Sequence, residues 1–148
     1  MNGPEQLKLK RMGDEGCYLI DLKKGADIFN HGDNTVDILA LYDLLTTTII
    51  QSKDGPKPIM DEDCYLNYAA LALGVMTGVR WSLEHGPADY KPRHGEIVIV
   101  RYAWKEINKV WSHFVLHLED GTIYDPLGNS RTVLYGKAVS TRIFRRVL

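Results

Sequence analysis

The spacing of hydrophobic residues predicts a helix at the start of the chain's first half. After Gly16, apolar residues recur at three- and four-residue intervals, the repeat of a helix with one buried face. Gly25 lies inside this pattern and is a candidate for the end of the helix. The apolar positions are Leu19, Leu22, Ala26 and Phe29.

Two more helices are expected before the middle of the chain. One is predicted from about Val36 to Gln51, with Asn34 or Thr35 as its N-cap. The stretch Ser52 to Pro58 contains glycine and two prolines, so we expect a loop there. A shorter helix is predicted for the Ala-Leu run that follows Asn67, whose side chain is a suitable cap.

The second half of the chain has the residue pattern of β-strands. Strand-like runs cover Glu96 to Tyr102, which is rich in β-branched residues, and Ser112 to Leu118. Asp120-Gly121 is a hairpin signal, and Thr122 to Asp125 is the expected returning strand. A last strand is predicted for Val139 to Arg145. Helices first and an antiparallel meander second indicate an α+β fold, and a length of 148 residues indicates one domain, residues 1–148.

Composition and charge exclude several classes of protein. Hydrophobic residues make up 45% of the chain and charged residues 25%, which is typical of a globular protein. Because the net charge is −1, we expect neither a nucleic acid nor a membrane surface as partner. No stretch resembles a signal peptide or a membrane span, so a cytoplasmic location is expected. The oligomeric state is not indicated.

Cys17 is the stronger of two candidate nucleophiles. It follows Gly16 at the start of the first predicted helix, where unpaired backbone N–H groups and the helix dipole favour a thiolate. The alternative is a buried core cysteine, the common fate of a free thiol. Cys64 follows three carboxylates in Asp61-Glu62-Asp63, which disfavour a thiolate, so we expect it to be structural.

The predicted Asp120-Gly121 hairpin would bring a histidine and a carboxylate within reach of each other. A three-residue loop, Glu119 to Gly121, with Gly121 in the left-handed conformation, would place Val115 opposite Asp125. His113 would then lie on the same sheet face as Asp125, on a diagonal. A nucleophile, a base and a group that orients the base are the parts of covalent catalysis. A two-residue loop would reverse the parity and remove this pair.

Three roles are open for His117, which shares that face. It is a plain polar side chain, the base in place of His113, or a ligand in a metal site with His113 and Asp125. Trp104 and Trp111 bracket a predicted loop beside His113, where they would line a substrate groove or cover the core.

The order of these residues resembles the papain-like cysteine peptidases. The resemblance is carried by Gly16-Cys17 at a helix start, by Gly95-Glu96-Ile97-Val98-Ile99-Val100, by His113-Phe114-Val115 and by Tyr124-Asp125-Pro126-Leu127-Gly128. It is closest to the bacteriocin-processing leader peptidases, a branch that includes small bacterial and phage proteins. The resemblance implies N-terminal helices packed on a C-terminal antiparallel sheet. It also implies Cys17 as nucleophile, His113 as base and Asp125 as the group that orients the base.

The oxyanion donor departs from that pattern. Peptidases of this branch carry a glutamine several residues before the cysteine, whereas the nearest upstream glutamine here is Gln6, eleven residues away. Loss of one oxyanion donor lowers turnover by about 10²–10³. Two functions are therefore expected. One is a cysteine peptidase or amidase without a cofactor or metal, acting on a peptide or amide substrate. The other is a catalytically inactive papain-like binding protein.

Overall fold

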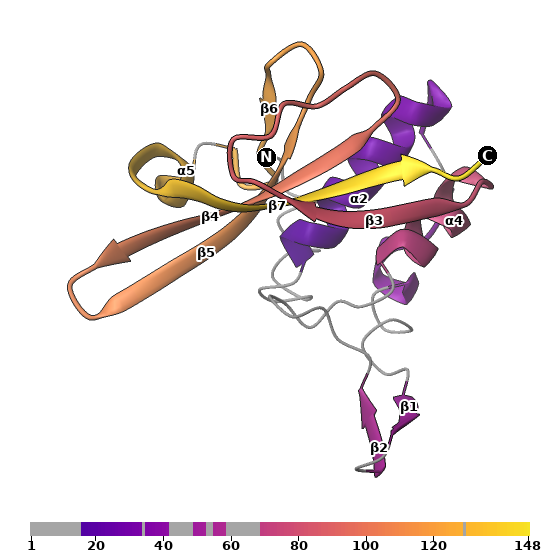
Figure 1. Ribbon diagram of the computed structural model, residues 1–148, viewed down its shortest axis with the longest axis horizontal. Coiled ribbons are helices and arrows are strands. Elements are labelled where there is room, and N and C mark those ends of the chain that lie inside the picture. The colour runs from indigo at the N-terminus through magenta and orange to yellow at the C-terminus, as the bar shows by residue number, and fades with distance from the viewer. Residues whose placement is uncertain (1–15, 34, 42–48, 53–54, 59–68, 129) are drawn as a thin grey trace.

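The computed structural model describes residues 16–33, 35–41, 49–52, 55–58, 69–128 and 130–148, and its fold is α+β (Figure 1). A five-stranded antiparallel sheet has the order β3-β7-β4-β5-β6, and β1 and β2 pair separately. The elements are α2 (Gly16–Asn30), β1 (Ile49–Ser52), β2 (Gly55–Pro58), α4 (Ala69–Thr77), β3 (Trp81–Gly86), β4 (Ile97–Glu106), β5 (Lys109–His117), β6 (Ile123–Tyr124), α5 (Arg131–Tyr135) and β7 (Lys137–Arg146).

Helix α2 confirms the predicted first helix and runs through Gly25 to Asn30. Gly25 is not its end. A Cβ atom at Gly25 would lie only 2.7 Å from Cγ2 of Ile97 on β4. The glycine therefore allows α2 to pass close to the sheet, a tertiary reason that the helical periodicity does not contain.

The start of the predicted second helix is confirmed among the described residues. Residues 38–41 are helical, and the carboxylate of Asp37 accepts hydrogen bonds from the backbone N–H groups of Leu39 and Ala40 at 3.0 and 3.3 Å. Asp37, rather than Thr35, therefore caps this helix, and Asn34 lies outside the described residues.

The prediction that this helix reaches Gln51 is wrong, because Ile49–Ser52 is strand β1. It pairs with β2 in the stretch predicted as a loop, with Ile49 opposite Pro58 and Ser52 opposite Gly55. The sequence leading into β1 is Thr-Thr-Thr-Ile-Ile, and β-branched side chains favour strands over helices.

Helix α4 confirms the third predicted helix and extends it to Thr77, while its suggested cap, Asn67, lies outside the described residues. None of the helices in the described part of the chain is long and apolar enough to cross a membrane.

The sheet is a meander only from β4 to β6. The last strand, β7, returns to pair with β4 on one side and with β3 on the other. Strand β3 was not predicted, since its solvent-exposed pattern lacks an apolar run. The insertion of β7 places the end of the chain in the middle of the sheet, where its residues Thr141 to Phe144 are buried.

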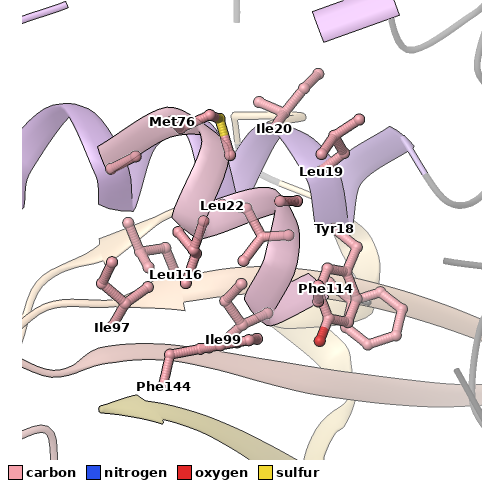
Figure 2. Close-up of a cluster of buried hydrophobic side chains, with 14 of the residues drawn as sticks. Tyr18, Leu19, Ile20, Leu22, Met76, Ile97, Ile99, Phe114, Leu116 and Phe144 are labelled. Carbon is pink, nitrogen blue, oxygen red and sulfur yellow. The ribbon is translucent and has the colours of Figure 1, made fainter. Parts of the chain in front are cut away.

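Helices α2 and α4 cover one face of the sheet, and the main hydrophobic core lies between them and the strands (Figure 2). Alternation along β5 directs Phe114 and Leu116 into this core. The Tyr18 and Phe114 rings lie 4.9 Å apart between centroids. A smaller cluster of Val98, Val100 and Ile143 occupies the opposite face.

Strands β4 and β5 continue past the rest of the sheet as a projecting hairpin (Figure 1). Trp104 pairs with Trp111, and Glu106 pairs with Lys109 across a two-residue turn. The expectation that the two tryptophans bracket a loop is therefore wrong. Cross-strand pairing extends the hairpin through this polar stretch. The Trp104 ring packs against the Tyr135 ring of α5, with 5.6 Å between the ring centroids.

Candidate active site

The β5–β6 hairpin has the three-residue loop on which the predicted pair depends. Gly121 has a φ of 90°, and its N–H donates to the carbonyl of Leu118 at 3.0 Å. Leu116 lies opposite Tyr124 in the ladder. Continued by one residue, this register sets Val115 level with Asp125, so the predicted parity is confirmed.

His113 and Asp125 form a buried hydrogen bond. The distance from His113 Nε2 to Asp125 Oδ1 is 2.6 Å, and the two side chains are 5% and 7% exposed. Exclusion of water strengthens such a bond. The structure therefore brings together the two residues predicted as base and orienting group.

The Asp125 carboxylate is held on both oxygens. Oδ1 also accepts from the N–H of Leu127 at 2.9 Å, and Oδ2 accepts from the N–H of Ser130 at 3.1 Å. Burial by itself would raise the pKa of Asp125, but the hydrogen bonds from His113, Leu127 and Ser130 hold it below its ordinary value. Asp125 is therefore an anion at neutral pH, and His113 presents its N–H to it through Nε2.

The short helix α5 completes the support of Asp125 and was not predicted. Its N-cap is Ser130, whose hydroxyl accepts from the N–H of Val133 while its own N–H binds Asp125. The signal in the sequence was a serine before Arg131-Thr132-Val133, a short helix start after a turn. Asp125 is thus fixed between the end of β6 and the start of α5.

Cys17 lies in the first turn of α2, as predicted, and is 5% exposed. It belongs to the core cluster that also contains Phe114, on the α2 side of the sheet. Alternation along β5 directs His113 to the side opposite Phe114. The thiol and the imidazole therefore belong to different faces of β5.

The two faces of the sheet meet at the edge of β5. Strand β6 pairs only with Leu116 and His117, so the ladder on that edge stops before His113. From α2, the carboxyl of Asp21 is close enough to Asp125 for the two charges to interact. Asp21 follows Cys17 by one turn on α2.

Asp21 is a buried carboxyl group on α2 that the sequence pattern did not single out. It is 0% exposed, and neither carboxyl oxygen has a hydrogen-bond partner among the described residues. Burial, and secondarily the charge of Asp125, raises its pKa well above the ordinary value. The available signal was an aspartate four residues after Cys17 on an otherwise apolar helix face.

His117 has a role that does not require a metal. Its Nε2 atom lies 3.0 Å from the hydroxyl of Tyr102, and burial lowers its pKa. No group of three or more His, Cys, Asp or Glu side chains within the described ranges is arranged to hold a metal ion. The metal interpretation of His113, His117 and Asp125 is therefore not supported.

Two residues of the sequence analysis, Gln6 and Cys64, lie outside the described residues.

Comparison with known proteins assigns a family without a function. The family model described as "Protein of unknown function, DUF261" matches residues 6–146. No curated protein and no solved structure matches the chain.

Proposed function

Because the chain belongs to the DUF261 family of proteins of unknown function, we propose a function from its own residues: a cysteine hydrolase of peptide or amide bonds with a papain-like fold. The observation that carries the proposal is the buried 2.6 Å hydrogen bond between His113 and the ionised Asp125. A histidine held in this way at one nitrogen presents the other nitrogen as a base.

The proposed reaction has two steps. The thiol proton of Cys17 passes to Nδ1 of His113, and the sulfur attacks the substrate carbonyl carbon. As the C–N bond breaks, His113 returns the proton to the leaving amine, and a thioester remains. Water, deprotonated by His113, then cleaves the thioester and regenerates the thiol. Asp125 stabilises the imidazolium in both steps.

The backbone N–H of Cys17 is the first candidate for the oxyanion donor. It lies in the first turn of α2, at the positive end of the helix dipole, which favours a developing negative charge. Gln6 is the second candidate, by resemblance to the leader peptidases.

A second candidate function has its own supporting observation. Cys17 is 5% exposed and belongs to the core on the face of β5 opposite to His113. Buried cysteines are commonly inert. The alternative is therefore a papain-like binding protein in which the thiol does no chemistry.

Alkylation by iodoacetamide, followed at each cysteine by mass spectrometry, separates the two functions. A nucleophilic Cys17 reacts well below pH 7, whereas a free thiol titrates near pH 8.5. We expect His113→Ala and His113→Gln to reduce the rate at pH 6 by about tenfold or more, because the base is lost.

The matched control is His117→Ala, which removes a histidine from the same strand and the same face. We expect it to leave the alkylation of Cys17 unchanged. Labelling of Cys17 only near pH 8.5 or above, with no effect of His113, would contradict the hydrolase and favour the binding protein.

A further inference from the structure

Asp21 is a buried carboxyl group that the proposed reaction does not use. It is 0% exposed, and neither oxygen has a hydrogen-bond partner among the described residues. An isolated carboxylate in such surroundings is strongly disfavoured, and the group keeps its proton instead. Asp21 is therefore a neutral acid, which agrees with its raised pKa.

The position of Asp21 ties it to Cys17. The two residues are four apart on α2, where side chains are neighbours with about 5–6 Å between their Cβ atoms. Helical side chains lean toward the N-terminus, so the Asp21 carboxyl lies over the turn that carries Cys17. The charge of Asp125 also acts on Asp21.

We propose that Asp21 is a positioning residue of this site. In its neutral form it adds no second negative charge near Cys17 and Asp125. When it ionises, its charge disfavours formation of the Cys17 thiolate. The effect of Asp21 on the Cys17 thiolate rests on the proposed function. The protonated state of Asp21 does not depend on that function. A pair of carboxyl groups with pKa values driven apart, one raised and one lowered, is the usual way to separate an acid from an anion within one site.

The charged groups around Asp21 come from several elements. Cys17 lies on its own helix, His113 on β5, and Asp125 after β6. Arg142 of β7 lies on the same side of the sheet, with its guanidinium carbon 4.8 Å from the Phe114 ring centroid. Arg101 of β4 donates to the hydroxyl of Ser112 at 2.9 Å. Helix α4 has no titratable side chain between Ala69 and Thr77. Of these groups, only Asp125 contributes to the shift of the Asp21 pKa.

The protonated state is tested by the stability of Asp21→Asn. The native protein holds a proton on Asp21 that the unfolded chain releases above pH 3.9, the ordinary pKa of aspartate, so the wild type loses stability as the pH rises from that value toward the folded pKa. Asparagine is neutral at every pH. We expect the urea midpoint of Asp21→Asn to gain on the wild type by about 0.5–1 M between pH 4 and pH 7.5.

The matched control is Asp27→Asn, on the same helix, where the carboxylate pairs with Lys23 at 3.0 Å in partly exposed surroundings. Asp21→Leu, which is also neutral, gives the same pH trend as Asp21→Asn even if it packs less well. A midpoint difference that is flat with pH in both Asp21 variants overturns the protonated assignment.

The effect on Cys17 is tested by its alkylation rate in wild type and Asp21→Asn from pH 5 to pH 9. We expect equal rates in the acid range where Asp21 keeps its proton. We expect the variant to be about threefold or more faster in the range where Asp21 ionises, because one negative charge beside the thiolate is removed. Asp27→Asn should show no such change of ratio with pH, and a constant ratio in Asp21→Asn overturns the proposed action on Cys17.

The outcomes that test Asp21 can be distinguished from the outcomes that test the hydrolase. If His113→Ala leaves Cys17 reactivity unchanged but Asp21→Asn still changes its pH profile, the hydrolase fails and the inference about Asp21 stands. If His113→Ala abolishes the reactivity and Asp21→Asn has no pH-dependent effect, the hydrolase stands and the inference about Asp21 is overturned.

Discussion

Asp125 shows how one residue joins local sequence to site chemistry. Within the described residues, Asp125 accepts hydrogen bonds from a histidine on β5 and from two backbone N–H groups that follow it in the chain. The two backbone bonds are local and belong to the Asp-Pro-Leu-Gly turn and the start of α5. The bond to His113 depends on the hairpin register, which the loop with Gly121 determines.

Asp125→Asn is expected to lower the free energy of unfolding at pH 7 by about 1.5–3 kcal/mol, the usual contribution of hydrogen bonds to a buried charge. The folded pKa of Asp125 lies below its unfolded value of about 3.9. Its contribution is therefore complete above that value and is lost as the pH falls through the folded pKa.

Urea unfolding at several pH values measures this difference, which should be largest at pH 7 and should vanish as the pH falls through the folded pKa of Asp125. Asp89→Asn, at an exposed position before β4, is the control for the change of charge alone. An equal loss at pH 7 and at acid pH would show that Asp125 acts only through packing.

At the scale of elements, the contact between α2 and β4 sets the position of Cys17. Gly25 meets Ile97 at a separation that leaves no room for a methyl group, with 2.7 Å between an added Cβ and Cγ2. The same helix carries Cys17 two turns earlier and Asp21 one turn earlier. A glycine that looked like a helix end is therefore the place where the helix packs on the sheet.

Gly25→Ala is expected to destabilise the protein by about 1 kcal/mol. Alanine improves helix propensity by about 1 kcal/mol, but overpacking against Ile97 costs about 1–3 kcal/mol. Ile97→Ala relieves the overlap, so the double variant should show a coupling energy of about 0.5–2 kcal/mol in a double-mutant cycle. Gly32→Ala, with nothing within 4 Å of the added methyl group, is the control. Additive effects of Gly25→Ala and Ile97→Ala would show that α2 does not depend on this contact.

At the scale of the whole molecule, the two helices and the sheet share one main core (Figure 2). Leu22 of α2 is 0% exposed, and it lies among side chains from both helices and several strands. By contrast, Leu71 on α4 is 60% exposed. The stability of the site therefore depends on burial of one side of each helix.

Leu22→Ala is expected to lower the free energy of unfolding by about 2–5 kcal/mol, because it leaves a cavity in the core. Leu71→Ala removes the same atoms from an exposed position and should change it by less than about 0.5 kcal/mol. Equilibrium unfolding in urea compares the two variants. Similar losses for both would contradict the arrangement of α4 on the core.

The sequence by itself determined the features that depend on neighbours in the chain. Periodicity located α2 and α4, and the chemistry of the Gly121 turn set the register that pairs His113 with Asp125. Each depends on dihedral preferences and side-chain spacing over a few residues. The α+β class followed from the same local patterns.

Only the tertiary structure decided which segments distant in sequence meet. It inserted β7 between β3 and β4, placed Cys17 and His113 on different faces of β5, and buried Asp21 beside the charge of Asp125. Local patterns carry no information on these contacts, because the free energy that selects them comes from burial of surfaces contributed by several elements at once. Whether the thiol is chemically active depends on that second set of contacts.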